Sequence, residues 1–196
     1  MKAKFLIIIG VLALIVFYGI SVNNSLVTAE EGVNAAWAQV ENQYQRRADL
    51  IPNLVNTVRG AADFESETLQ EVIEARSRAT SVNIDANDLN NPEAFRQFQE
   101  AQGQLSGALS RLLVTVERYP ELQANQNFRD LQAQLEGTEN RISTERMRFN
   151  QTAQEFNTEI RQFPKSMFAS MLGFEQKEYF QADEGAEQVP EVDFSN

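Results

Sequence analysis

Two short polar clusters carry the residue types of this chain that are best suited to chemistry. Their members are Arg46, Arg47 and Asp49 in the first cluster, and Glu139, Asn140 and Arg141 in the second. A guanidinium group binds carboxylates in a planar, bidentate geometry, so an Arg47–Glu139 or an Asp49–Arg141 pair between two helices is chemically natural. Such a network either fixes the register of the helices, which is the favoured interpretation, or forms an interhelical site for an anion or a partner.

Few other residues of the chain are candidates for a catalytic role. The chain of 196 residues contains 28 Asp and Glu, 17 Lys and Arg, and no His or Cys. This composition excludes the commonest general base, thiol nucleophiles, structural zinc sites and the Glu-x-x-His pairs of di-iron bundles. The acidic residues at helical spacing are typical of a solvated surface: Glu67, Glu71, Glu74, Glu155 and Glu159. Without phosphate-loop, dinucleotide or nucleophile-elbow motifs, we expect no catalytic residues, no metal, no cofactor and no enzyme.

The overall composition indicates a helical protein. The net charge of −11 argues against nucleic acid as a partner, because binding phosphates requires a basic surface. Only nine Gly and five Pro argue against a turn-rich β fold. We therefore expect an all-α protein.

The first 22 residues are predicted to be a transmembrane signal anchor. Residues 5–22 carry no charge, and as a helix they would span about 27 Å, close to the hydrocarbon thickness of a bilayer. The alternative is a signal peptide that is cleaved after the small residues near Ala29. Lys2 and Lys4 before the run, with Glu30 after it, favour a cytoplasmic N-terminus and a body outside the cytoplasm. A cytoplasmic body is the alternative topology.

Residues 23–164 are predicted to form an antiparallel, up-and-down four-helix bundle. Apolar residues recur at helical spacing, as in Leu26, Val33, Trp37, Val40 and Tyr44. We expect a helix break at Pro52, a loop at 81–91 and a helix that Asn91 caps. A three-helix bundle with a kink at Pro52 is the alternative, because RRADLIPN contains no glycine for a turn.

Residues 165–196 differ from the bundle in composition. A short amphipathic helix is expected to end at Gly173, and an acidic tail follows the aromatic residues near position 180. We interpret this segment as a cap over one end of the bundle. The alternative is a strip that docks on a membrane surface or a partner, formed by Met167, Phe168, Met171, Leu172, Tyr179 and Phe180.

Several motifs resemble the LemA family. The chain contains QRRADLIPNLV, EARSRAT and LEGTENRIS, followed by RFN, FNTEIRQFP and GFEQKEYF. The resemblance covers residues 23–194 behind one N-terminal membrane helix, and more distantly it extends to LemA-like proteins associated with magnetosomes. Two segments depart from the family pattern: AADFES replaces a segment with Tyr and a His–Glu pair, and QYQRR replaces QLQRR.

The resemblance implies a helical bundle anchored to a bacterial membrane, without an established catalytic activity. We expect a non-catalytic scaffold or adaptor of the bacterial envelope, held in the inner membrane by a single-pass anchor and binding protein partners through its bundle surface. One alternative is a small-ligand or anion receptor, or an enzyme, with a polar site between helices. Another is an oligomer that shapes the membrane.

Overall fold

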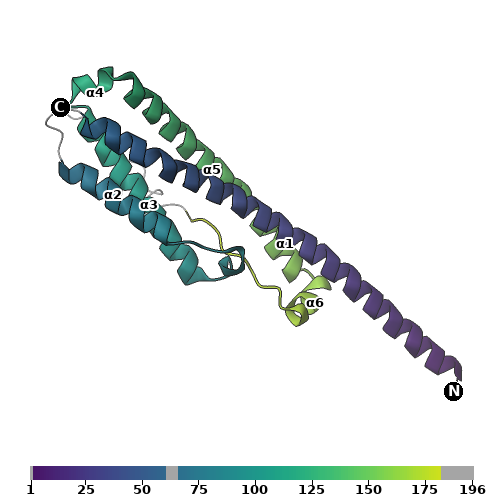
Figure 1. The fold of residues 1–196 in the computed structure, drawn as a ribbon. Helices are drawn as coiled ribbons and strands as arrows, with labels where there is room; N and C mark the ends of the chain where they lie inside the picture. The colour runs from purple at the N-terminus through teal and green to yellow at the C-terminus, as the bar shows by residue number, and fades with distance from the viewer. Residues whose placement is uncertain (1, 61–65, 182–196) are drawn as a thin grey trace, which may run out of the picture.

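The computed structural model describes residues 2–60 and 66–181, and these residues form helices and connecting segments without a strand. The helices are α1 (Lys2–Arg59), α2 (Ser66–Ser81), α3 (Pro92–Val116), α4 (Pro120–Ala124), α5 (Gln126–Arg161) and α6 (Lys165–Leu172), with a 3-10 turn at η1 (Ala86–Asp88). Figure 1 shows α1, α2, α3 and α5 running up and down beside one another. The predicted all-α, antiparallel four-helix architecture is confirmed. The acidic tail from residue 182, and the AADFES segment except its last residue, lie outside the described residues.

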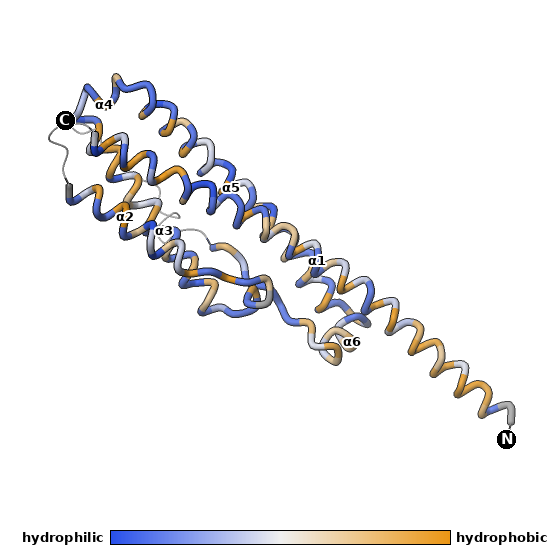
Figure 2. Tube along the Cα trace, viewed as in Figure 1, coloured by the Kyte–Doolittle hydropathy of each residue, from blue (hydrophilic) through white to orange (hydrophobic). Residues whose placement is uncertain are grey.

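The longest element, α1, contains both the predicted anchor and the first helix of the bundle. Its apolar N-terminal end projects beyond the other helices (Figure 2), and its side chains from Phe5 to Phe17 are exposed. Val22 is the first residue of α1 to be buried. The projecting end is long and apolar enough to cross a membrane. The predicted boundary after residue 22 thus falls inside a continuous helix, at the level where the core begins.

The predicted helix break at Pro52 is wrong, and so is the kinked three-helix alternative. α1 continues through Pro52 to Arg59, and α2 is a separate helix that returns beside it (Figure 1). Pro52 has no N–H to donate to the carbonyl group of Ala48, one turn earlier. Arg76 of α2 supplies the donor instead, since its Nε lies 2.8 Å from the Ala48 carbonyl oxygen. This bond satisfies the carbonyl that a proline inside a helix leaves without a partner.

The interior of the bundle consists of two hydrophobic clusters. The aromatic core, nearer the projecting end of α1, contains Trp37, Phe95, Phe98, Phe149 and Phe180 together with aliphatic residues. The aliphatic core, at the far end, is built mainly of Leu, Ile, Val and Ala from the second half of α1 and from α2, α3 and α5. Between the two clusters lie the buried polar residues Arg47, Gln102 and Thr138. A polar layer therefore divides the bundle into two halves.

Local capping residues set the boundaries of the shorter helices. As predicted, the Asn91 side chain accepts hydrogen bonds from the backbone N–H groups of Glu93 and Ala94, and Pro92 occupies the first turn of α3. Asn125 caps α5 in the same way. Gly173 ends α6 in the left-handed region, with φ of 82°, a conformation that glycine adopts without the strain of a Cβ atom.

Beyond α6, the chain turns back along the bundle. α6 packs against both α1 and α5, and we call residues 174–181, which follow it without helical structure, the C-terminal strap. The strap passes the loop between α2 and α3, where the Glu178 N–H donates to the Leu89 carbonyl oxygen at 2.8 Å. The side chain of Phe180 then enters the aromatic core.

Candidate functional site

The centre of the polar layer is the guanidinium group of Arg47, which is 1% exposed. Its Nη1 donates to Ser106 Oγ at 2.7 Å and to Glu139 Oε2 at 2.8 Å, and its Nη2 donates to Gln102 Oε1 at 2.7 Å. The group also lies 5.1 Å from the centre of the Tyr44 ring, within the range of a cation–π interaction. One charge on α1 is thus held by hydrogen bonds to both α3 and α5.

Burial of the two charged partners is unequal. The side chain of Glu139 is 53% exposed, whereas that of Arg47 is 1% exposed. Water therefore solvates the carboxylate, while the guanidinium depends on protein acceptors for most of its stabilisation. The Nε of Arg47 is buried and has no hydrogen-bond partner in the structure. The arginine is neutralised by Glu139 but is not fully satisfied.

The other residues of the two predicted polar clusters do not join this layer. Arg46, Asp49, Asn140 and Arg141 are exposed, and Asp49 accepts a hydrogen bond from Gln45 on its own helix. The expected Asp49–Arg141 pair does not form, because residues two apart on a helix point in different directions. With Arg47 and Glu139 facing each other, Asp49 and Arg141 are turned away from the interface.

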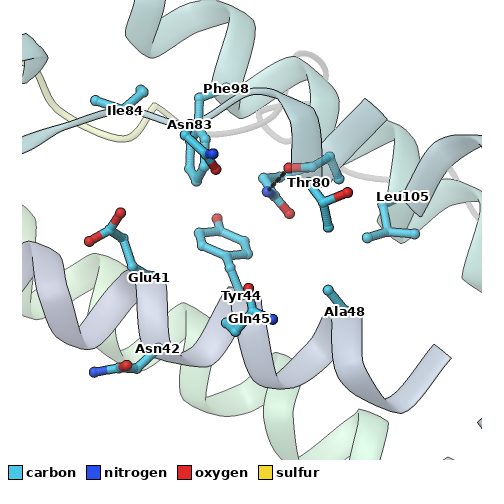
Figure 3. Close-up of a pocket in the computed structure, with 12 residues that line it drawn as sticks. Glu41, Asn42, Tyr44, Gln45, Ala48, Thr80, Asn83, Ile84, Phe98 and Leu105 are labelled. Carbon is cyan, nitrogen blue, oxygen red and sulfur yellow. Dashed lines mark hydrogen bonds between the residues drawn. The ribbon is translucent and has the colours of Figure 1, made fainter. Parts of the chain in front are cut away.

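A cavity of about 220 Å³ lies beside the polar layer, between α1 and the α2–α3 pair. In Figure 3, Glu41 and Tyr44 extend from α1 towards Asn83, Ile84 and Phe98, while Asn42 turns away. Burial raises the pKa of Glu41, the charge of Asp85 raises it further, and a hydrogen bond with Trp37 opposes both. The lining can accept a small polar molecule.

Tyr44 links the polar layer to the aromatic core. Burial raises the pKa of its phenol above the ordinary value, although the neighbouring Arg146 and Arg47 lower it. The phenol is therefore neutral at pH 7, and its oxygen accepts a hydrogen bond from Arg146 Nε at 2.6 Å. The Arg146 guanidinium also lies 4.7 Å from the centre of the Phe180 ring.

A second cavity, also of about 220 Å³, opens on the other side of Arg47. Leucines of α3 and α5 form its apolar lining, and its polar lining consists of Arg47, Ser106, Ser110, Glu136 and Glu139. Across residues 2–60 and 66–181, no group of three or more acidic side chains is placed to hold a metal ion. Of these two cavities, the second is the one in which a small ligand would meet the buried Arg47.

Two asparagines of α5, which sequence reasoning missed, hold the C-terminal strap. Asn157 donates to the Lys177 carbonyl and accepts from the Lys177 N–H, both at 2.8 Å. Asn150 makes the same pair of bonds with the backbone of Phe180, both at 2.9 Å. Each side-chain amide thus pairs with one strap residue as a neighbouring β-strand would. The signal in the sequence is a Phe-Asn dipeptide that repeats after seven residues, which places both asparagines on one face of α5.

The predicted docking strip is divided by the fold. Phe180 is buried in the aromatic core, so its place in the predicted docking strip is wrong. The hydrogen bonds with Asn150 hold the backbone of the strap against α5 at this residue. Phe168 is half-buried, and its ring meets Tyr18 of α1 edge-on at 5.6 Å. The exposed members are Met167, Met171, Leu172 and Tyr179.

The comparisons with known proteins fit this architecture. The model of the LemA family matches residues 36–194, which include the polar layer and the C-terminal strap. The chain belongs to the LemA family. This match confirms the resemblance that the motifs indicated, and it covers every helix of the bundle apart from the first part of α1.

Similar proteins occur in Paramagnetospirillum, Magnetospirillum and Metamycoplasma. Magnetosome protein MamQ 2 of Paramagnetospirillum magneticum is 27% identical over 194 residues, which cover 90% of this chain and 71% of that protein. Magnetosome protein MamQ of Magnetospirillum gryphiswaldense is 27% identical over 173 residues, covering 80% of this chain and 64% of that protein. Protein LemA of Metamycoplasma hominis is 25% identical over 182 residues, covering 92% of this chain and 79% of that protein. Together with the apolar end of α1, these relatives suggest a membrane-associated LemA-family protein.

Proposed function

We propose that this LemA-family protein is a non-catalytic scaffold, anchored in a membrane, that presents its helical bundle to protein partners. The observation that carries this proposal is the continuity of α1, which leads without interruption from an exposed apolar segment into the core of the bundle. A continuous helix positions the bundle relative to the membrane more firmly than a flexible linker would. The similarity to magnetosome proteins supports a role at a membrane.

The proposed topology places the N-terminus in the cytoplasm and the bundle outside it, in the inner membrane of a bacterium. Lys4 precedes the apolar segment, and Glu30 and Glu31 follow it. An excess of positive charge on the cytoplasmic side is the common pattern for single-pass anchors. Fusion of a reporter that is active only outside the cytoplasm to Asn196 tests this topology, and activity of a cytoplasm-only reporter at the same position would reverse it.

Partner binding is tested by photocrosslinking in intact cells. A photoreactive amino acid is placed at Val114 of α3 or Met147 of α5, which are 65% and 70% exposed on the bundle surface. A scaffold should give protein adducts of defined mass that are enriched over those of a control with the same group at the buried Leu112. If neither exposed site gives more protein adducts than the buried control, the scaffold proposal fails.

A second candidate function, a receptor for a small polar ligand, is favoured by the cavity that Arg47 lines and by the unpaired Nε of Arg47. A ligand that binds there should raise the melting temperature of the wild-type protein. It should have no such effect on an Arg47→Met variant that still folds. A ligand library that gives no shift with the wild-type protein would leave the polar layer with a purely structural role.

A further inference from the structure

The segment between Lys165 and Glu175 carries no charge over nine residues. It contains α6 and the turn at Gly173. Three of its exposed side chains are large and apolar: Met167 is 67% exposed, Met171 is 74% exposed and Leu172 is 44% exposed. Phe163, just before α6, is 80% exposed. This patch would be costly to leave in water.

The contacts of α6 place this patch beside the apolar end of α1. Phe168 packs edge-on against Tyr18 and lies so close to Gly19 that a Cβ atom there would come within 3.0 Å of the Phe168 ring. Both α1 residues belong to the uncharged run 5–22. α6 therefore touches α1 at a level that the bilayer would surround.

Polar contacts hold the residues that flank the segment beside parts of the bundle that lie beyond Val22, the end of that uncharged run. Before the segment, Lys165 Nζ lies 3.0 Å from Glu159 Oε2 and 3.3 Å from Ser25 Oγ. After it, Lys177 Nζ lies 2.7 Å from Glu30 Oε1. Residues 166–174 thus descend along α1 towards its apolar end and return, with their charged neighbours held against the bundle.

We propose that residues 166–174 dip into the lipid leaflet from which α1 emerges, with Met167, Met171 and Leu172 in contact with lipid. Tyr18 lies about 6 Å along the helix axis from the end of the apolar run at Val22. Amphipathic segments at membrane surfaces insert their apolar faces to about 5–10 Å below the headgroups, and this depth agrees with that position. The bilayer is the occupant because the patch is continuous with the apolar surface of α1. This inference rests on the proposed membrane anchoring.

The chain contains no Cys, so a single introduced cysteine can carry an environment-sensitive fluorophore at one position. The full-length protein is reconstituted in phosphatidylcholine nanodiscs, one copy per disc, with the label at Met171. Nitroxides on the lipid acyl chains, placed either near the headgroup or near the chain end, then quench labels at different depths. A label at Met147, an equally exposed methionine on α5, is the matched control, and a label at Leu12 reports insertion of α1.

The expected result is quenching of the Met171 label by the nitroxide near the headgroup, quenching of the Leu12 label by the deep nitroxide, and no quenching at Met147. A Leu12 label that escapes quenching would overturn the membrane anchoring and this inference with it. If Leu12 is quenched but Met171 behaves like Met147, only the dipping segment is refuted. A Met171 label that is shielded from water only in discs with two copies, and without quenching, would assign the patch to a second copy of the chain.

Discussion

The two halves of the bundle enclose their hydrophobic cores with different parts of the chain. In the half far from the projecting end of α1, the four long helices α1, α2, α3 and α5 surround the aliphatic core, and α4 adds Leu122. In the nearer half, α2 has ended at Ser81 and α3 does not begin until Pro92. There the loop between them and the C-terminal strap complete the wall around the aromatic core.

This difference shows how a bundle can be lengthened beyond its shortest helices. Beyond the end of α2, large flat rings fill the space beside α1, α3 and α5: Phe180 lies 4.9 Å from Phe95 and 5.6 Å from Phe149, centre to centre. The Asn150 and Asn157 amides satisfy backbone groups of the strap that a helix would satisfy internally. The near half therefore depends on contacts between segments far apart in sequence, whereas α2 and α3 of the far half pair through one short loop.

The largest expected effect comes from removing the ring that closes the near half. Phe180→Ala should lower the free energy of unfolding by about 3–5 kcal/mol, because it empties a buried aromatic site. Urea unfolding of the full chain in detergent measures this loss. Phe163→Ala, at a site that is 80% exposed, is the matched control and should change stability by less than about 0.5 kcal/mol.

Hydrogen exchange on the Phe180→Ala variant locates the loss. Amides near Trp37 and Phe149 should exchange faster, and those near Leu54 and Leu109 should keep their protection. Equal loss of protection in both halves would mean that they unfold as one unit, and the distinction between them would have no energetic basis.

The polar layer between the halves should respond asymmetrically to substitution. Glu139→Ala leaves the buried Arg47 charge without its counter-ion and should cost about 3 kcal/mol. Arg47→Met removes the buried charge and leaves Glu139, which is 53% exposed, in contact with water. It should cost about 1 kcal/mol, mainly because Gln102 Oε1 loses its donor. Urea unfolding of both variants shows which substitution costs more. A larger loss for Arg47→Met would show that the hydrogen bonds of Arg47 stabilise the fold by more than burial of its charge destabilises it.

In the far half, Arg76 and Pro52 should be coupled. Arg76→Met should cost about 1 kcal/mol or more in the wild-type chain, because the Ala48 carbonyl loses its donor. In a Pro52→Ala background the N–H of residue 52 can serve that carbonyl, so the same substitution should cost less. A double-mutant cycle by urea unfolding measures the difference, and additive effects would show that Arg76 stabilises α2 for another reason.

The smallest effect concerns Glu41, beside the cavity of Figure 3. Its raised pKa means that the folded carboxyl holds its proton more tightly than the unfolded one, so ionisation destabilises the fold. Glu41→Gln should therefore be more stable than wild type at pH 7, by less than about 1 kcal/mol because solvent screens the exposed carboxyl. This advantage should fade as the pH falls through the folded pKa to the ordinary value of 4.5. A constant difference across pH 4–8 would contradict it.

Local signals in the sequence predicted the features that depend on local interactions. Helical periodicity, the Asn91 cap and the Gly173 terminus involve residues within one or two turns of each other. The continuity of α1 through Pro52 could not be predicted in this way, because the compensating donor comes from another helix. The asparagines of α5 looked like ordinary polar surface for the same reason, since their partners lie 20 to 30 residues further on.

The polar layer could be predicted from the sequence only in part. Residue chemistry pointed to an Arg47–Glu139 interaction, but it could not choose between that pair and Asp49–Arg141 without the rotation of each helix. That rotation is decided by the apolar residues around the pair, such as Tyr44 and Ile51 of α1, which are buried. The docking function, which was the alternative interpretation of the whole C-terminal strip, now remains a proposal for its exposed part alone.

The unbroken course of α1 also fixes the rotation of the bundle relative to the apolar end of the same helix. Each residue of an α-helix advances the side-chain direction by about 100°, so one residue inserted between Val22 and Ser25 would turn the entire bundle by that angle relative to side chains such as Tyr18. Insertion of a full heptad would raise the bundle by about 10 Å and nearly restore its original facing. In a chain built this way, the number of residues between the membrane and the first core contact is itself an orientation signal.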